Sequence, residues 1–395
     1  MLKNKIAALA KENLQTFIEV RHHLHENPEL SFCENQTSLF IQDQLSSFGI
    51  PFTIMGRTGV IGLIEGKDPQ SRCIALRADI DALPITEEND ISYKSKNVGV
   101  MHACGHDVHT TCLLGAAKIL LTLKDEWTGT IKLIFQPGEE KHPGGASLLI
   151  KDGVLENPAP HGIIGLHVHP GLDAGKLSFR KGMVMASADE IYITISGPGG
   201  HAAAPQLTTD IVLIAAQIIV ALQQVVSRNA NPFSPSVLSI CAINGGTATN
   251  IIPREIKLMG TFRAMDEAWR AKAHLIIKKI TIDIASSMGA NAEINILKGY
   301  PTVKNDPTFT GNAWKLAEEF QGKENVSETE LRMGAEDFGF YSQEIPGCFF
   351  RLGVRNEAKN IIHNVHTPKF NIDESAIETG MGIMAWLGAK ASTEF

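Results

Sequence analysis

Three short apolar segments place the strongest constraint on the fold, because each has the length of a buried β-strand and each is followed at once by polar residues. They are CIALR (73–77), TIKLIF (130–135) and GIIGLHV (162–168). Between the first two, residues 109–123 are rich in good helix formers. Strands that alternate with helices are typical of a parallel sheet. We therefore predict an α/β domain whose mixed, largely parallel sheet is flanked by helices.

The pattern changes near Gly182, where apolar and polar residues begin to alternate. Strand and helix patterns follow in the order β-α-β-β-α-β, at 190–196, 210–228, 236–243, 255–263, 267–288 and 292–297. This order predicts a ferredoxin-like α+β domain, inserted at 184–298 into a first domain formed by 1–183 and 299–395. The helix at 210–228 is apolar nearly all round. Such a helix is buried on more than one side, and its second side suits a subunit interface.

Charge and composition exclude several classes of function. The formal net charge is −7 and the Lys and Arg residues are scattered, so we expect no nucleic-acid partner. We find no apolar stretch approaching 18 residues and no apolar core of a secretory signal at the N-terminus, so we expect no membrane partner. The six cysteines include no CxxC pair, which indicates reduced thiols. We expect a soluble, cytoplasmic protein.

Polar side chains follow all three predicted strands. CIALR leads to Asp79 and Asp81, TIKLIF leads to Glu139 and Glu140, and GIIGL leads to His167 and His169. In an open parallel sheet, ligands bind outside the carboxyl ends of the strands. We therefore expect these carboxylates and imidazoles to converge on one crevice.

A fourth cluster, MHACGHDVHT (101–110), precedes the first predicted helix and contains Cys104, His106 and His109. Thiolate and neutral imidazole are preferred ligands for Zn and similar metals. In the Glu139-Glu140 pair, one carboxylate can bind a metal while the other serves as general base. One such pair alone would be explained as well by a solvated or capping role. Four clusters at strand ends favour a metal site.

Ten motifs in order make the chain resemble the M20 metallopeptidase family, in its amidohydrolase branch of hippurate hydrolases, N-acyl amino acid deacylases and auxin-conjugate hydrolases. The motifs are RHHLHENPEL (21–30), ALRADIDALPITE (75–87), MHACGHDVHT (101–110), FQPGEE (135–140), GLHVHP (165–170), GPGGHAAAP (197–205), NIIP (250–253), GTFR (260–263), GAEDFG (334–339) and HTPKF (366–370). The resemblance spans nearly the whole chain.

The resemblance implies a catalytic domain with two divalent metal ions and an inserted lid domain that forms a homodimer. The implied metal ligands are Cys104, His106, Glu140, His167 and His366. His363 is a competing position for the last ligand, but the Thr-Pro-Lys-Phe after His366 favours His366. The metals suited to this set are Zn, Mn, Co or Ni.

Other residues receive roles around these ligands. By the resemblance, Glu139 is the general base and His201 crosses from the other subunit to stabilise the oxyanion. Asn250 and Arg263 are implied to hold the polar end of the substrate. Asp79 and Asp81 are candidates for orienting a ligand or the base, and the sequence does not decide between them. His102 and His109 lie beside ligands and are expected to have supporting or plain surface roles, not to bind metal.

The chain departs from the branch in two places near the site. Gly138-Glu139-Glu140-Lys141 stands where the branch usually has Ala-Glu-Glu-Gly, and His169 stands where it often has an aromatic residue. His169 is therefore a candidate substrate contact. The expected activity is metal-dependent hydrolysis of the amide bond in small N-acyl amino acids. The alternatives are a dipeptidase and a small-molecule binding protein without catalysis.

Overall fold

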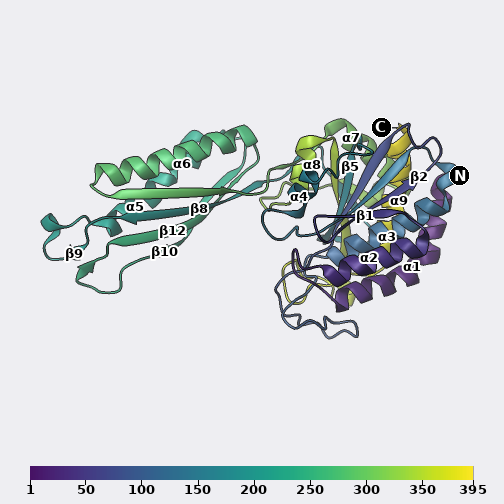
Figure 1. Ribbon diagram of the computed structural model, residues 1–395, viewed down its shortest axis with the longest axis horizontal. Coiled ribbons are helices and arrows are strands. Elements are labelled where there is room, and N and C mark those ends of the chain that lie inside the picture. Colours follow the sequence, from purple (N-terminus) through teal and green to yellow (C-terminus); the bar gives the residue numbers. More distant parts are fainter. Residues whose placement is uncertain (395) are drawn as a thin grey trace. The chain divides into compact units, whose positions relative to one another are not determined.

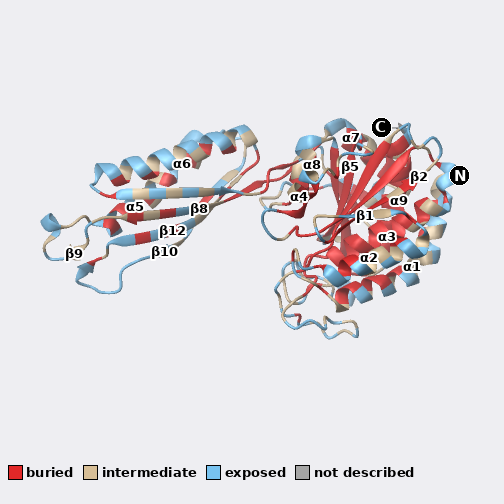
Figure 2. Cartoon of the chain, viewed as in Figure 1, coloured by how far each residue is buried: buried red, intermediate tan, exposed pale blue. Residues whose placement is uncertain are grey.

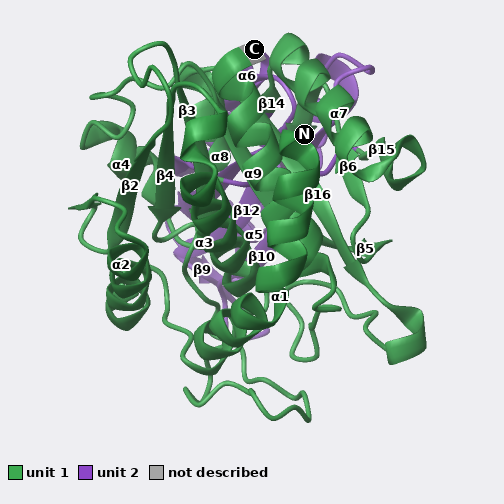
Figure 3. Cartoon of the chain, turned by 90° about the vertical axis from the view of Figure 1, so that its right-hand side faces the viewer, with its two compact units in different colours: residues 1–184, 304–330, 337–395 green, residues 185–303, 331–336 purple. Residues whose placement is uncertain are grey.

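The computed structural model describes residues 1–394 and divides into two compact units (Figure 3). Unit 1 consists of Met1–Val184, Lys304–Glu330 and Asp337–Phe395, and unit 2 consists of Met185–Val303 and Leu331–Glu336. Each unit has its own hydrophobic core. The lid and dimerisation role expected of 184–298 stays a prediction.

Within the described residues, the main sheet of unit 1 has eight strands in the order β1-β2-β4-β3-β5-β16-β6-β15 (Figure 1). Their bounds are Phe52–Met55 (β1), Gly59–Glu65 (β2), Cys73–Asp79 (β3), Thr130–Gln136 (β4), Ile163–Asp173 (β5), Leu177–Phe179 (β6), Val326–Glu328 (β15) and Gly347–Arg355 (β16). The four central strands β4, β3, β5 and β16 are mutually parallel. Strand β2 pairs antiparallel with both β1 and β4, while β6 is antiparallel to β16 and parallel to β15. The prediction of a mixed, largely parallel sheet is confirmed.

Helices pack on this sheet because side chains alternate between its two faces. Ile74 and Leu76 of β3 belong to the large core of unit 1. That core also includes buried residues of the helices α1 (Leu2–Glu26), α3 (His106–Thr122), α7 (Pro307–Gln321) and α9 (Ala376–Glu394), while α2 (Asn35–Phe48) contributes Ile41 and Leu45. Figure 2 shows the central strands largely buried, with β3 and β4 buried throughout and only the end of β5 exposed. Two short helices, α4 (Gly145–Lys151) and α8 (Phe338–Glu344), contact each other, and Phe338 of α8 stacks on Phe349 of β16.

Unit 2 contains a four-stranded antiparallel sheet in the order β10-β12-β8-β13, with α5 and α6 packed on it. Its elements follow the predicted β-α-β-β-α-β order: β8 (Ser187–Ser196), α5 (Ile211–Leu222), β10 (Ser236–Asn244), β12 (Glu255–Ala264), α6 (Glu267–Ser287) and β13 (Asn291–Lys298). Two short pairs accompany these sheets: β9 (Gly200–His201) with β11 (Ile251–Ile252), and β7 (Gly182–Met185) with β14 (Val303–Asn305).

One expectation about membranes needs correction. The helical segment Ile211–Asn229 is long and apolar enough to cross a membrane by length and composition, although no such stretch was expected. A single helix of this kind is weak support for a membrane span, since core helices pass the same test. Asp210 caps its start by accepting hydrogen bonds from the backbone N–H groups of Val212 and Leu213. The cytoplasmic location stays a prediction.

A buried ion pair joins helix α6 to strand β8 in unit 2. Asp189 accepts hydrogen bonds from Arg270 (Nη2 to Oδ1, 2.5 Å) and contacts His274 Nε2 (2.7 Å). Burial alone would raise the pKa of Asp189, but the hydrogen bonds from His274 and Arg270 outweigh burial and lower that pKa to about 2. A depressed carboxyl pKa stabilises the fold above the ordinary pKa, and the gain disappears as the pH falls through the folded value.

We predict that Asp189→Asn lowers the melting temperature of the protein at pH 7. The difference in melting temperature between the variant and the wild type should shrink as the pH falls from about 4 toward about 2, because Asp189 itself becomes protonated there. Thermal unfolding followed by circular dichroism across this range measures the effect. Asp283→Asn is the matched control, because Asp283 pairs with Lys279 on the exposed surface of the same unit and should change stability by only about 0–1 kcal/mol. A gap that stays constant with pH would contradict the prediction.

Candidate metal centre

The carboxyl ends of three neighbouring strands bring the polar residues of unit 1 together. Asp79 is the last residue of β3 and lies beside Gln136, the last residue of β4. His167 lies in β5, on the other side of β3. Cys104 lies in the loop before α3, and His106 is the first residue of α3. That loop needs glycine at position 105, because φ is +81° there and a Cβ would lie 2.6 Å from the Val168 side chain.

The five predicted ligands form two groups that share Cys104. One group is Cys104, His106 and His167, and the other is Cys104, Glu140 and His366; in each, the possible ligand atoms lie within 4.8 Å of one another. Cys104 Sγ is 3.5 Å from His167 Nε2 and 3.3 Å from His366 Nε2. His366 Nε2 is also 3.1 Å from Glu140 Oε1. A thiolate at this position can therefore face two cations at once.

The ring of His106 is held so that one nitrogen faces this centre. Its Nδ1 lies 3.2 Å from Asp81 Oδ1, while its buried Nε2 has no hydrogen-bond partner among residues 1–394. Burial alone would lower the pKa of His106, but Asp79, Asp81 and Glu140 outweigh it and raise the pKa to about 10. A carboxylate behind one ring nitrogen is how proteins orient a metal-binding histidine.

His167 is oriented in a similar way by the backbone. Its Nδ1 lies 2.7 Å from the carbonyl oxygen of Val168, to which it donates, and Nε2 faces Cys104. Burial, followed by the nearby Arg351, holds the pKa of His167 well below its ordinary value. A neutral imidazole with Nε2 unprotonated is the form that binds metals.

His109 is excluded as a ligand by its own hydrogen bonds. Its Nε2 accepts from the backbone N–H of Val168 (2.9 Å), so the ring proton is on Nδ1, which contacts Asp79 Oδ1 at 2.6 Å. Both ring nitrogens are thus used within the protein, although Asp79, His106 and His109 also lie within 4.8 Å of one another. His109 contacts Asp79, and the supporting role expected of His109 stays a prediction.

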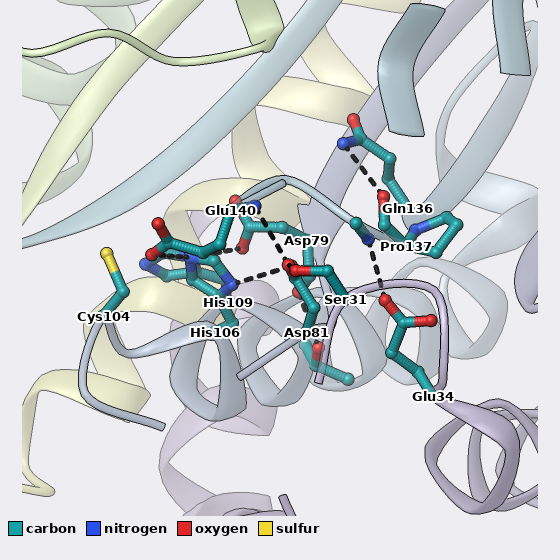
Figure 4. Close-up of polar contacts among 12 residues, drawn as sticks. Ser31, Glu34, Asp79, Asp81, Cys104, His106, His109, Gln136, Pro137 and Glu140 are labelled. Carbon is teal, nitrogen blue, oxygen red and sulfur yellow. Dashed lines mark hydrogen bonds and ion pairs between the residues drawn. The ribbon is translucent and has the colours of Figure 1, made fainter. Parts of the chain in front are cut away.

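The two aspartates that the sequence could not separate have different contacts (Figure 4). Asp81 accepts from the backbone N–H of Glu140 (Oδ2, 3.0 Å) and contacts His106 Nδ1, so it touches two predicted ligands. Asp79 Oδ1 lies 3.8 Å from His106 Nε2, on the side of the ring that faces the centre. Asp81 is placed to orient ligands, and Asp79 is placed at the centre itself.

A buried arginine, which was not among the site residues predicted from the sequence, holds Asp79 in place. Arg77 donates to Asp79 Oδ2 (2.6 Å), Gln136 Oε1 (2.9 Å) and Asp337 Oδ1 (2.8 Å). Asp337 also accepts from the backbone N–H of Ala146, at the start of α4. Burial would raise the pKa of Asp79, but Arg77 and the neighbouring histidines lower it far below its ordinary value. A charged residue inside the otherwise apolar strand CIALR was the signal in the sequence.

The remaining expected residues of unit 1 lie near the same place. Glu139 is buried, and its carboxylate is within 4.8 Å of the ligand atoms of His106 and Glu140. His169 is half-buried in β5, two residues after His167, and its Nδ1 accepts from the backbone N–H of Gly171. His363 belongs to none of the groups that could hold a metal among the described residues.

Three expected residues belong to unit 2. His201 is exposed in β9 and pairs with Ile251 of β11, directly after Asn250. Its Nδ1 accepts from the backbone N–H of Ala203 (3.0 Å), which leaves Nε2 to carry the proton of the neutral ring. Arg263 lies in β12 opposite Ala188, whereas β9 follows the other end of β8. Within unit 2, His201 and Asn250 are therefore together and Arg263 is apart from them.

The arrangement suits divalent cations on chemical grounds. Thiolate, imidazole and carboxylate are the ligands of Zn and similar metals. His106 supplies a ring nitrogen that has no hydrogen-bond partner in the described part of the chain, and Cys104 is common to both groups. Burial, together with Glu140, Glu139 and Asp79, raises the pKa of Cys104 well above its ordinary value, so the thiol would lose its proton only on binding a cation.

Comparisons with known proteins agree on one family. Residues 75–387 match the profile of peptidase family M20/M25/M40. The chain is 39% identical over 383 residues to N-acetyl-L-cysteine deacetylase of Bacillus subtilis, covering 95% of this chain and 89% of the relative. It is 40% identical over 397 residues to thermostable carboxypeptidase 2 of Saccharolobus solfataricus, covering 100% and 98%.

A solved structure agrees as well. The YXEP protein of Bacillus subtilis, described as a dinuclear metal-binding peptidase from the M20 family, superimposes with a TM-score of 0.84 at 33% identity. The likeness covers 98% of this chain and 100% of that one.

We predict that Arg77→Met lowers the free energy of unfolding by about 3–5 kcal/mol, because it leaves the buried carboxylates of Asp79 and Asp337 without their cation. Thermal unfolding of the metal-free protein at pH 7 measures this. Lys176→Met is the matched control, since Lys176 pairs with Asp173 on the exposed surface and its loss should cost about 0–1 kcal/mol. Equal effects of the two substitutions would show that Arg77 does not balance buried charge.

Proposed function

The chain belongs to peptidase family M20/M25/M40, and on that premise we propose that it hydrolyses the amide bond of small N-acyl amino acids with two divalent metal ions. Membership in this family makes the chain a hydrolase. The observation that carries the proposal is the pair of ligand groups that share Cys104, with the carboxylate of Glu139 beside them. Cys104, His106, Glu140, His167 and His366 would hold the ions.

The residues around this centre divide the chemistry between them. When bound, divalent cations would lower the pKa of a water molecule and polarise the scissile carbonyl. Glu139 would take the proton of the attacking water and deliver it to the leaving amine. Asp81 would keep His106 and Glu140 in place, and Arg77 would keep Asp79 charged.

Unit 2 would supply the groups that complete the site. His201 can stabilise the oxyanion, because its exposed ring donates through Nε2 while Nδ1 accepts from the backbone. Asn250 lies beside it and would contact the polar end of the substrate. Arg263 is a further candidate for a substrate carboxylate. Burial lowers its pKa, and its Nε donates to Thr261. As a lid, unit 2 would exclude water from the reaction.

The substrate class is proposed from the relatives and from the groups in the site. Relatives at about 40% identity are named N-acetyl-L-cysteine deacetylase, N-acyl-L-amino acid amidohydrolase and thermostable carboxypeptidase. Deacylation and carboxypeptidase action both cut an amide next to a free carboxylate, which suits a site with Arg263 or His169 as a contact. A dipeptidase is the alternative. In addition to a contact for the carboxylate, it would need an acidic contact for the free amine of its substrate.

Exposed apolar side chains of unit 2 support a proposal about its assembly. Helix α5 is buried on one side, yet Val212, Leu213 and Val220 on its other side are exposed, Val220 by 70%. Strand β10 is an edge strand of the sheet, and its Val237 and Ile243 are exposed too. Apolar side chains on a helix and an edge strand favour a second copy of the chain as the partner. We propose a homodimer formed through this surface.

We predict that Glu139→Gln keeps the metal content of the wild type and lowers turnover by about 10²–10⁴-fold, because only the proton transfer is lost. The measurements are metal analysis after reconstitution with Zn or Co and a release assay with N-acetyl and N-benzoyl amino acids, dipeptides and C-terminally free peptides. Glu140→Gln is the matched control at the next residue and should lose metal as well as activity. Normal hydrolysis by the Glu139→Gln variant would refute the assignment of the base.

We predict that His201→Ala lowers turnover by about 10²–10³-fold without loss of metal. If His201 acts in the partner subunit, co-expression of differently tagged His201→Ala and Glu139→Gln chains should restore activity. Each hybrid dimer then has one site with both Glu139 and His201. Purification through both tags, with the mass checked by light scattering, isolates the hybrid. A dimeric hybrid without recovered activity would contradict the exchange of His201, and a monomeric wild type would contradict the dimer.

A further inference from the structure

The turn between α1 and α2 contacts both loops that carry the carboxylates of the metal centre (Figure 4). Ser31 and Glu34 lie in this turn, and both are buried. The turn is attached to the sheet edge by the backbone, since the N–H of Ala82 donates to the carbonyl of Glu29 and Leu30 forms a bridge with Ala82. Among the described residues, Glu34 belongs to none of the groups that could hold a metal.

Ser31 completes the hydrogen bonds of Asp81. Its Oγ donates to Asp81 Oδ2 at 2.6 Å, and the same oxygen accepts from the backbone N–H of Glu140. The other oxygen of Asp81 contacts His106 Nδ1. Asp81 is wholly buried, so its orientation depends on these three contacts. The Ser31 hydroxyl is therefore one residue removed from two proposed ligands, His106 and Glu140.

Glu34 holds the loop in which Glu139 and Glu140 lie. Its Oε1 accepts from the backbone N–H of Gly138 (2.8 Å) and of Phe32, and its Oε2 accepts from Thr58 Oγ1. Burial, followed by the charge of Asp81, raises the pKa of Glu34. Burying a carboxylate close to another carboxylate costs free energy. An uncharged polar side chain would fill the same space at lower cost. In return, Glu34 provides a fixed hydrogen-bond acceptor for the backbone N–H of Gly138.

The backbone of the turn is strained where it meets Gly138. Phe32 has φ of +65°, a conformation that costs a bulky residue of order 1–3 kcal/mol and is found where function requires it. The ring of Phe32 lies against Gly138, so that a Cβ at Gly138 would be 2.3 Å from Phe32 Cε1. The turn and the loop are thus fitted to each other through both hydrogen bonds and packing.

We propose that Ser31 and Glu34 are positioning residues of the metal centre. Ser31 fixes Asp81 and, through it, His106 and Glu140; Glu34 fixes Gly138 and, through it, the course of the chain into Glu139 and Glu140. The inference rests on the proposed two-metal function, because it concerns how tightly and in what geometry the ions are held. The sequence motif RHHLHENPEL (21–30) ends within this turn, directly before Ser31, and has no other assigned part in the site.

Cobalt binding tests the proposal without relying on activity. Metal-free protein is titrated with Co²⁺, and visible absorption reports both the affinity and the ligand geometry, including the bond from the Cys104 thiolate. Ser31→Ala is expected to bind Co²⁺ about 10–100-fold more weakly and with an altered spectrum, as for other residues that orient metal ligands. Ser31→Thr, which restores the hydroxyl, should recover both. Glu34→Leu should weaken binding in the same way, and Glu34→Gln, which keeps one acceptor oxygen, should recover it.

Ser187→Ala is the matched control. Ser187 is also buried, and its Oγ donates to the carbonyl of Ala264 in unit 2, so loss of this hydroxyl should lower the melting temperature without changing the cobalt spectrum. A folded Ser31→Ala protein with wild-type affinity and spectrum would overturn the role of Ser31, and equal cobalt binding by folded Glu34→Leu and Glu34→Gln would overturn that of Glu34. If Glu34→Leu does not fold, the Ser31→Ala and Ser31→Thr pair still decides the proposal. A wild type that binds no Co²⁺ would instead refute the two-metal function.

Discussion

An excess of buried negative charge at the carboxyl edge of the main sheet is the constraint on which the rest of the site depends. Asp79, Asp81, Glu139 and Asp337 are all buried there. Arg77 balances Asp79 and Asp337 through direct ion pairs. The remaining carboxylates, with Glu140 and the Cys104 thiol, lie around imidazoles that must be neutral to act as ligands. Divalent cations are the groups that would balance this charge and use those imidazoles.

Many of the candidate site residues could be predicted because they lie in short sequence motifs. Strand CIALR and its two aspartates, the Cys104-Gly105-His106 loop and the Glu139-Glu140 pair each lie within a few residues. The order of the strands could not be predicted, because β16 pairs with β5 although about 180 residues separate them along the chain, a pairing that local pattern does not encode. The partnership of Arg77 with Asp337 is hidden for the same reason.

Hydrogen bonds that the sequence cannot show distinguish neighbouring histidines. His109 and His106 are three residues apart on one helix, and the sequence favoured His106 as the ligand. The backbone N–H of Val168 donates to Nε2 of His109, whereas Nε2 of His106 has no hydrogen-bond partner among residues 1–394.

The surface of α5 is a different case. Its sequence is apolar all round, and periodicity alone does not tell a subunit interface from a membrane or a core.

The turn at Ser31–Glu34 shows why an N-terminal segment without ligands belongs to the centre. The two loops contact each other directly through Asp81 and the backbone N–H of Glu140, and a segment that binds both loops fixes that contact further. Ser31 binds the loop after β3 through Asp81, and Glu34 binds the loop after β4 through Gly138. Since the proposed ligands Glu140 and His106 are reached only through these loops, small shifts of either would change the distance between ligand atoms. Metal affinity falls steeply with such shifts, so the α1–α2 connection acts on the chemistry through geometry alone.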